Sequence, residues 1–190
     1  HLERGRAVYA CYANQSGIER NMSAYADWQA EFEKKLDAIL DDYPVLDAQS
    51  IFIDGWISAY LIFHSDRFTA AIQRPALINL TTAYGNCVAG HVLPFGESLK
   101  DMMLALAKQS ILIDVDNCKT PCLILYREGN KDYSREQSEQ LYGAMKDRNP
   151  DVPCRMAVFT EKQWNAGYLK EISDWVERFT LSGGVLIDYK

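Results

Sequence analysis

The chain has 190 residues, a formal net charge of −6 and a hydrophobic fraction of 48%. This length supplies enough apolar material for one domain with its own core, and the composition excludes a disordered chain or a small disulfide-stabilised scaffold. The excess of acidic over basic residues has the wrong sign for a phosphate-binding surface, so nucleic acid is not an expected partner. We expect one cytoplasmic domain over residues 1–190 that spans no membrane.

The first half of the chain alternates short apolar runs with helical patterns. A short apolar run predicts a buried strand, and apolar residues that recur every three or four positions predict an amphipathic helix. The predicted strands cover residues 6–12, 50–53 and 69–73. The predicted helices cover residues 25–40 and 56–63, and residues 76–96 show no clear period. Pro44 follows the first helix and stops it.

The second half shows the same alternation. The predicted strands cover residues 121–126 and 153–159, and the predicted helices cover residues 98–108, 134–146 and 168–181. Ser134 can cap the middle helix. Strands that are separated by crossover helices form a parallel sheet with helices on both faces. The predicted fold class is therefore α/β.

The cysteine pattern favours reduced thiols. The cysteines are Cys11, Cys87, Cys118, Cys122 and Cys154, an odd number, and three of them fall in apolar runs. This distribution indicates core thiols rather than a disulfide framework. Cys118 and Cys122 lie four positions apart, but no second pair with metal-ligand spacing accompanies them. We expect neither a metal nor a cofactor.

The turns after the predicted strands are the candidate functional positions, because ligands of parallel sheets bind at the carboxyl ends of the strands. These turns cover residues 14–18, 54–59, 74–76, 127–131 and 160–165. Their charged side chains are Asp54, Arg74, Arg127 and Lys131, for which solvated surface is the default assignment. The segment 51–60 has the strand-turn-helix form of a nucleophile elbow, which needs a serine or cysteine at its apex.

Several motifs follow one another in a fixed order. They are Arg4–Val8, Asp27-Trp28 before a helix, the elbow region Asp47–Phe68, Lys119–Leu125 (KTPCLIL) and Glu136–Leu141 (EQSEQL). In this order they resemble the prolyl oligopeptidase family of serine peptidases, particularly its acylaminoacyl-peptidase-like members. The resemblance covers nearly the whole chain. It implies an α/β-hydrolase-like, mostly parallel sheet that is flanked by helices and lacks the first strands of the fold.

The resemblance also shows departures at the catalytic triad of serine, aspartate and histidine. Laid on this chain, the family motifs G-x-S-Y-G-G-Y, H-G-x-x-D and F-P-x-x-x-H-G place Trp56, Asn130 and Trp164 at the triad positions. Residues 14–19 lack the tyrosine that the resemblance implies for the oxyanion hole. Because loss of a nucleophile or its base typically costs on the order of a millionfold in turnover, we expect negligible peptidase activity.

Other assignments do not restore a triad. Ile57, or Phe52 in an ungapped match, is an alternative apex, and neither is a nucleophile. Ser58 as a displaced nucleophile needs a base, for which the internal histidines His64 and His91 are the candidates. Neither histidine follows the last predicted strand, where the base of this constellation belongs.

Trp56, Trp164 and Arg127 are the candidate ligand-binding residues. Both indoles follow predicted strands, and indole rings stack well on apolar or planar ligands. The alternative is that the two rings fill the vacated catalytic cleft, because a void in a packed interior is destabilising. The sequence favours the filling role.

These observations predict a catalytically inactive serine-peptidase-like domain that serves as a binding or scaffolding module. The alternative is an active serine peptidase or acylaminoacyl hydrolase with a non-standard or misaligned triad. The resemblance implies that the chain is the C-terminal part of a longer protein and that its sheet has an exposed edge. The expected partners are a peptide or protein, the rest of a longer chain, or a second copy at that edge.

Overall fold

The computed structural model describes residues 7–11, 22–84, 98–180 and 185–189. Six strands form one sheet in the order β1-β6-β2-β3-β4-β5, and every neighbouring pair is parallel. The strands are β1 (Ala7–Cys11), β2 (Ile51–Gly55), β3 (Ala70–Gln73), β4 (Cys122–Arg127), β5 (Cys154–Phe159) and β6 (Val185–Tyr189). The α/β-hydrolase-like fold class that the sequence predicts is thereby confirmed.

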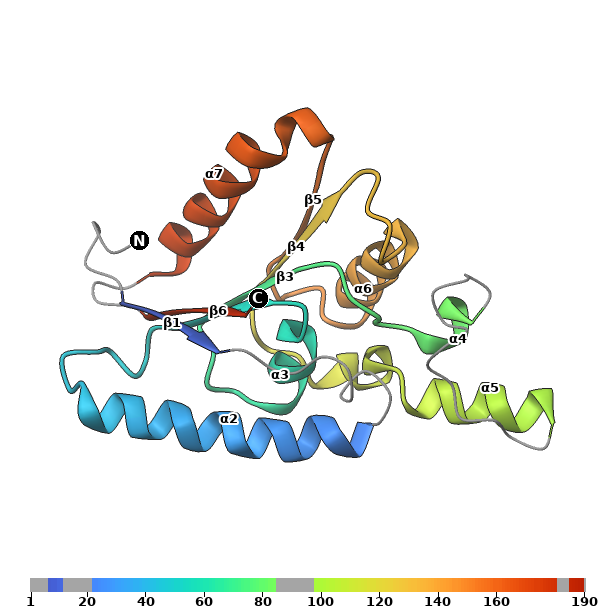
Figure 1. Ribbon diagram of the computed structural model, residues 1–190, viewed down its shortest axis with the longest axis horizontal. Helices are drawn as coiled ribbons and strands as arrows, with labels where there is room; N and C mark the ends of the chain where they lie inside the picture. The colour runs from blue at the N-terminus through green and yellow to red at the C-terminus, as the bar shows by residue number, and fades with distance from the viewer. Residues whose placement is uncertain (1–6, 12–21, 85–97, 181–184, 190) are drawn as a thin grey trace.

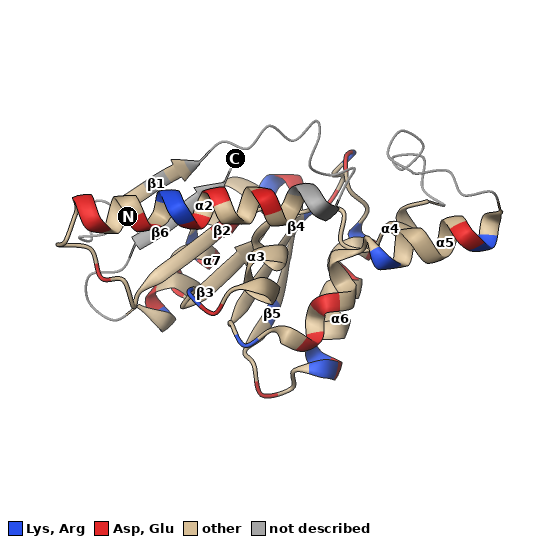
Figure 2. Ribbon diagram, turned by 90° about the horizontal axis from the view of Figure 1, so that it is seen from below, with Lys and Arg blue, Asp and Glu red and all other residues tan. Residues whose placement is uncertain are grey.

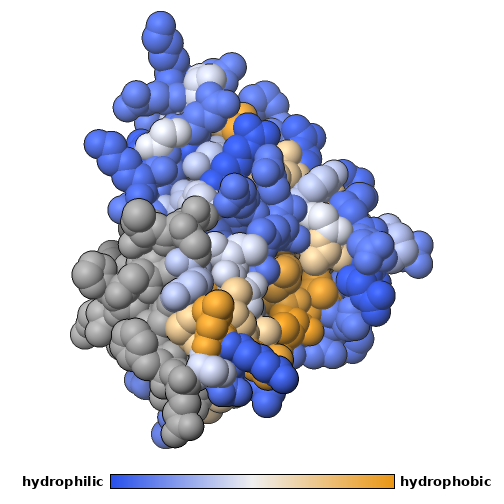
Figure 3. All heavy atoms as spheres, turned by 90° about the vertical axis from the view of Figure 1, so that its right-hand side faces the viewer, coloured by the Kyte–Doolittle hydropathy of each residue, from blue (hydrophilic) through white to orange (hydrophobic). Residues whose placement is uncertain are grey.

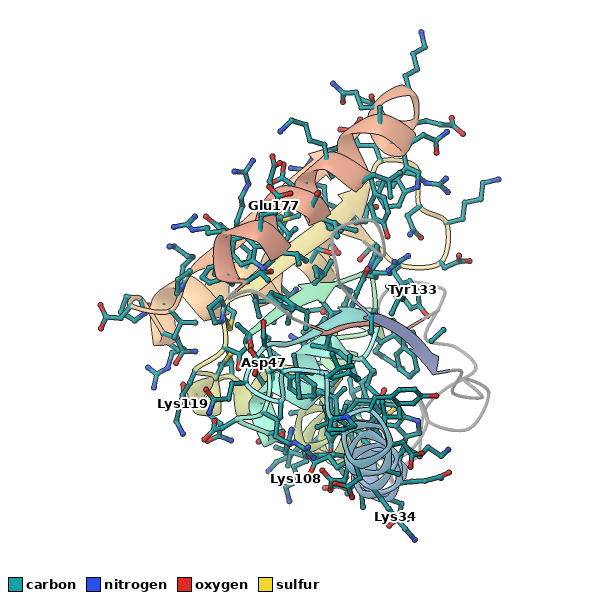
Figure 4. All side chains as sticks on the ribbon, turned by 90° about the vertical axis from the view of Figure 1, so that its left-hand side faces the viewer. Lys34, Asp47, Lys108, Lys119, Tyr133 and Glu177 are labelled. Carbon is teal, nitrogen blue, oxygen red and sulfur yellow. The ribbon has the colours of Figure 1, made fainter. Side chains whose placement is uncertain are left out.

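Helices cover both faces of this sheet. They are α2 (Met22–Asp42), α3 (Ser58–His64), α4 (Leu80–Ala83), α5 (Leu99–Lys108), the 3₁₀ helix η3 (Ile111–Asn117), α6 (Arg135–Arg148) and α7 (Glu161–Phe179). Figure 1 shows α2 and α7 on opposite sides of the sheet. Figure 4 shows the same arrangement end-on, with Lys34 on the outer side of α2 and Glu177 on α7. Among the described residues, no helix combines the length and apolar character that a bilayer crossing requires.

The two faces of the sheet build two separate apolar clusters, because successive side chains of a strand point to opposite faces. Ile51 and Ile53 of β2 pack in the first cluster with Phe32 of α2. Phe52 lies between them in the strand and packs in the second cluster with Ile172 of α7. All five residues of β2 are buried, as expected for a strand inside a parallel sheet.

Helix α2 is amphipathic, as its spacing predicts. Its apolar stripe, including Phe32 and Leu36, is buried against the sheet. Its outer face is exposed, and Figure 2 shows acidic residues along the helix. The pairing of Lys35 with Glu31 at 2.6 Å lies on this solvated surface.

The last helix and the last strand differ from the sequence-based prediction. Helix α7 begins at Glu161 instead of residue 168, because Thr160 and Gln163 form a capping box that starts the helix directly after β5. Strand β6 is absent from the prediction, which ended at the helix 168–181. The predicted turn at 160–165 is therefore mostly helix.

Strand β6 is last in the chain but lies inside the sheet. Val185 is in register with Ala7 of β1 on one side and with Ile51 of β2 on the other. Within the described ranges, β6 is the strand that joins β1 to the rest of the sheet. Within the part of the chain that the structure describes, the two edge strands of the sheet are β1 and β5.

Candidate functional site at the carboxyl ends of the strands

The turn after β2 occupies the position of a nucleophile elbow. Trp56 and Ile57 connect β2 to α3, and Trp56 is only 5% exposed, with its indole 6.4 Å from the ring of Tyr25. A nucleophile elbow holds its apex in a sharp, strained turn. Ile57 has a φ of −97°, and no described residue except a glycine has a positive φ. The turn is therefore an ordinary relaxed connection.

Gln73, at the end of β3, closes this turn. Its Oε1 accepts the backbone N–H of Ala59 at 2.5 Å, and its Nε2 donates to the carbonyl oxygens of Trp56 at 2.7 Å and Arg74 at 2.5 Å. Gln73 is 1% exposed. Because the first N–H groups of a helix have no partner within the helix, this side chain satisfies a buried donor at the start of α3.

Ser58 and His64 are not brought together. Ser58 is fully buried, and its Oγ has no hydrogen-bond partner in the structure that is described. The Nδ1 of His64 lies 2.8 Å from the carbonyl oxygen of Tyr60, and its Nε2 lies 3.3 Å from the carboxylate of Asp114. Both ring nitrogens therefore face other groups. His91, the other internal histidine, lies outside the described residues.

Asn130, which the resemblance aligns with the triad aspartate, organises the loop after β4. Its Oδ1 accepts the backbone N–H groups of Asp132 at 2.8 Å and Tyr133 at 3.0 Å. Its own N–H donates to the carbonyl oxygen of Arg127 at 3.2 Å, and Gly129 provides the left-handed residue of the turn, with a φ of 77°. The side-chain oxygen of Asn130 is thus used within the loop.

Five side chains form a continuous stack across the carboxyl ends of β2, β3 and β4, and we call it the strand-end column. The guanidinium carbon of Arg127 lies 5.7 Å from the ring centroid of Trp164, and the rings of Trp164 and Tyr168 are 4.4 Å apart. The guanidinium carbon of Arg74 lies 5.3 Å from the ring of Tyr168. Asp54 binds Arg74 through both carboxylate oxygens, at 2.7 and 2.8 Å. The column is a cation, two aromatic rings, a second cation and a carboxylate.

Packing under Trp164 fixes this end of the column. The ring of Phe159 meets Trp164 edge-on, with centroids 6.0 Å apart and planes at 77°. Gly167 of α7 lies against the same Phe159 ring, and a Cβ at this position would be 2.8 Å from the Phe159 Cε1. The absence of a side chain at Gly167 therefore allows α7 to approach β5.

The structure brings Trp164 and Arg127 together but leaves Trp56 apart. Trp56 belongs to the apolar cluster on the α2 side of the sheet, whereas Trp164 packs against the cluster on the α7 side. Trp56 and Trp164 both follow strands but turn to different faces of the sheet, so they do not form one stacked pair in this structure. The burial of Trp56 agrees with the filling role that the sequence favours. Lys131 is exposed.

Sequence reasoning missed two buried glutamines. One is Gln73, and the other is Gln137 of α6. The Oε1 of Gln137 accepts hydrogen bonds from the N–H groups of Ile78 and Asn79, each at 2.8 Å. Gln73 is a polar residue at the end of an apolar strand, which is the signal that could have identified it, whereas Gln137 stands in the polar start of α6 and has no such signal. Gln137 ties the segment before α4 to α6 and has a structural role.

A hollow of about 240 Å³ lies beside this segment. It is lined by Asn79, Thr81, Ala107, Ser110, Leu112 and Ile113. Figure 3 shows apolar surface on this end of the molecule, where Leu99, Leu104 and Ile113 are more than half exposed. The polar groups at its base bond to one another, with Ser110 Oγ donating to the carbonyl oxygen of Leu106 at 2.8 Å. None of Trp56, Asn130 and Trp164 lines this hollow.

The described cysteines are buried or half-buried and free, which confirms the prediction of reduced thiols for these residues. Burial raises the pKa of Cys118 to about 11 and that of Cys154 to about 12. Burial also raises the pKa of Cys122 well above its usual value. The side chains of Cys11 and Cys87 lie outside the described part of the chain. Over that described part, no group of three or more metal-binding side chains occurs.

A parallel sheet with helices on both faces and a strand-turn-helix after β2 defines the class of the α/β-hydrolase fold. No family model matches the sequence, and no curated protein matches it. Acylaminoacyl peptidase of Pyrococcus horikoshii superposes with a TM-score of 0.62 at 20% identity, over 78% of this chain and 27% of the peptidase. The sequence-based resemblance to acylaminoacyl-peptidase-like proteins is thus confirmed at the level of the fold.

Two further solved structures share this fold. A puromycin-hydrolyzing peptidase of Mycobacterium tuberculosis matches with a TM-score of 0.57 at 17% identity, over 80% of this chain and 26% of the peptidase. An esterase of Pyrococcus furiosus matches with a TM-score of 0.59 at 10% identity, over 93% of this chain and 82% of the esterase. The chain spans about a quarter of the length of the peptidases that it resembles.

Proposed function

We propose that this chain is a peptidase-like α/β-hydrolase domain without serine-hydrolase chemistry, which binds a peptide or protein at the carboxyl end of its sheet. One observation carries the proposal. The turn after β2 holds the buried Trp56 where the resemblance expects a nucleophile, and Gln73 accepts the N–H of Ala59, the donor that would follow a nucleophile at Ser58. Acyl transfer needs an exposed nucleophile and, as an oxyanion donor, the free N–H of the residue after it.

The other two triad positions support the same conclusion. Asn130 uses its side-chain oxygen within a loop, and Trp164 is part of the strand-end column. Neither residue can accept a proton from a nucleophile. The effects of losing triad members are not independent, so the residual rate depends on the oxyanion site and binding alone.

A binding function is favoured because the strand ends carry half-buried aromatic and cationic side chains. Trp164 and Arg127 are both intermediate in exposure and sit where parallel sheets bind their ligands. Aromatic and arginine side chains are also the residue types that dominate binding energy in protein interfaces. The outer edge of β1 is the place where a second copy, or another part of a longer chain, can pair.

Reaction with a fluorophosphonate probe tests the proposal. We expect no labelling and no hydrolysis of acyl-aminoacyl or aminoacyl chromogenic substrates above the buffer rate. An active serine peptidase that is treated in parallel verifies the reagents. Labelling that disappears in Ser58→Ala would establish the alternative, an active hydrolase with a displaced nucleophile, and would overturn the proposal.

A further inference from the structure

The strand-end column holds two arginines in matching positions, but within the described residues only Arg74 has a carboxylate partner. Arg74 stacks on Tyr168 and binds Asp54 through two hydrogen bonds. Arg127 stacks on Trp164 at the other end. Among the described residues, no aspartate or glutamate forms an ion pair with Arg127. The column is therefore charge-balanced at its inner end and open at its outer end.

We propose that Arg127 binds a carboxylate of a peptide ligand, while Trp164 contacts the apolar group next to that carboxylate. This inference rests on the proposed binding function and names its ligand class. The carboxylate comes either from the C-terminus of a peptide or from an acidic side chain. The inner arginine shows the expected geometry, since Asp54 meets Arg74 in a bidentate pair.

The stacked position of Arg127 suits this chemistry. A guanidinium that lies over a ring keeps its N–H donors at the edge of its plane, and this fork matches the two oxygens of a carboxylate. Contact with Trp164 also restricts the side chain before a ligand arrives, which lowers the entropy that binding costs. Because Arg127 is half-buried, the interaction is weakened less by water than on an open surface.

The neighbouring acidic residues leave Arg127 open. Glu128 follows Arg127 in the chain and Glu161 starts α7, yet both are exposed and neither forms an ion pair with Arg127. A net charge of −6 disfavours a dianionic ligand such as phosphate, which usually requires several cations. A single carboxylate is the anion that fits one open guanidinium.

Peptide titrations test the inference on the full chain. The probes are N-acetyl-Leu-Phe with a free C-terminus, the same peptide with an amidated C-terminus, and N-acetyl-Leu-Glu amide, with binding followed by calorimetry. We expect at least tenfold weaker binding of the Leu-Phe amide than of one or both carboxylate peptides, because a charge-assisted pair is lost. Binding of the free-terminus peptide or of the glutamate peptide identifies the source of the carboxylate.

Variants complete the test. Arg127→Gln should weaken the binding of the carboxylate peptides at least tenfold and leave the binding of the Leu-Phe amide unchanged. Lys131→Gln removes an exposed cation in the same loop and should change the binding of neither kind of peptide. Three results would each overturn the inference. They are equal affinity for the Leu-Phe amide and for both carboxylate peptides, an unchanged affinity for the carboxylate peptides in Arg127→Gln, and displacement of the bound peptide by inorganic phosphate at the peptide's own concentration.

The two proposals can fail separately. Peptide integrity is followed by chromatography in the same samples. Carboxylate binding through Arg127 by a chain that also cleaves the peptide would overturn the proposed function and keep the Arg127 site. Absence of carboxylate binding in a chain that cleaves nothing would overturn the Arg127 site alone.

Discussion

The side-chain oxygen of Gln73 accepts the backbone N–H of Ala59 at 2.5 Å, so the end of β3 caps the start of α3. The two residues belong to consecutive strand-helix units, and Gln73 also bonds the carbonyl oxygen of Trp56 in the turn between them. On the proposed function, this turn is held by the neighbouring strand as well as by the packing of Trp56. We therefore expect that a change at the apex alone does not open it.

Gln73→Leu should destabilise the fold by about 2–3 kcal/mol, because it leaves the N–H of Ala59 and the carbonyl oxygen of Trp56 buried without this partner. Urea unfolding measures the effect. Gln49→Leu is the matched control, since Gln49 is exposed and its side chain makes no hydrogen bond with the described residues. Equal stabilities of the two variants would show that the Gln73 bonds contribute nothing.

Restoring the triad residues should not restore activity. The triple variant Trp56→Ser, Asn130→Asp and Trp164→His supplies all three residue types, but the turn after β2 remains relaxed and does not present position 56 as a strained elbow does. We expect turnover within about tenfold of the unchanged chain, because triad residues give catalysis only as a correctly placed unit. Circular dichroism verifies folding. Fluorophosphonate labelling at position 56 would contradict this expectation.

Much of the fold could be predicted, because buried strands and amphipathic helices leave a local signal in the sequence. Strand β6 is different. Val185–Tyr189 is a short apolar run after two glycines, and its place between β1 and β2 depends on pairing with residues more than a hundred positions away. Such pairing has no local signature.

The site was predictable in part for a similar reason. Arg127 follows a strand and Trp164 lies in the first turn of the helix after another, so their presence at the strand ends could be predicted, and the structure joins them. Trp56 also follows a strand, but sequence order does not say to which face of the sheet a turn residue points. Gln73 was missed because two of its three hydrogen bonds reach the turn between β2 and α3, which only the folded chain brings beside it.

The Asp54–Arg74 pair should matter more than a surface pair of equal geometry. The Asp54 side chain is 3% exposed and that of Arg74 is 28% exposed. Asp54→Asn removes the charge that balances Arg74 and should cost about 2–4 kcal/mol, after allowance for the partial exposure of Arg74. Asp116→Asn breaks a similar pair with Arg148, in which the Asp116 side chain is 58% exposed and that of Arg148 is 56% exposed. This substitution should not change the midpoint of urea unfolding measurably.

A double-mutant cycle checks the assignment. Arg74→Met in the Asp54→Asn background should recover part of the loss, because the uncompensated cation is removed with it. Thermal or urea unfolding provides the four stabilities. Additive effects of the two substitutions would mean that Asp54 and Arg74 do not act as a pair.

Thiol reactivity should follow the raised pKa values. Burial raises the pKa of Cys118 to about 11, so only about one thiol in a thousand is ionised at pH 8. In a Cys11→Ser, Cys87→Ser background, Ellman's reagent should label the native chain slowly at pH 8, and three thiols should react at once in urea. Fast labelling of the native chain at pH 8 would contradict the burial of these thiols.

The same pKa values set the direction of the pH effect on stability. The thiols of Cys118 and Cys154 keep their protons in the folded state at a pH where the unfolded chain loses them. Above about pH 9 the folded state therefore binds more protons, and the stability from these thiols falls as the pH rises toward 11. Comparison with the Cys118→Ala, Cys154→Ala variant isolates this contribution, and an identical decline in both chains would refute it.

Two helical glycines should respond in opposite ways to alanine. Gly143 of α6 has open space around its missing Cβ, so Gly143→Ala should stabilise the fold by about 0.5–1 kcal/mol through the lower entropy of the unfolded chain. Gly167→Ala places a Cβ 2.8 Å from Phe159, whose ring is held by Trp164, and the resulting strain should cancel or reverse that gain. Urea midpoints of the two variants measure the difference. Equal stabilisation of the two variants would show that α7 can move away from β5 at little cost. Because Trp164 belongs to α7, its contact with Arg127 would then be less tightly fixed than the packing of Phe159 implies.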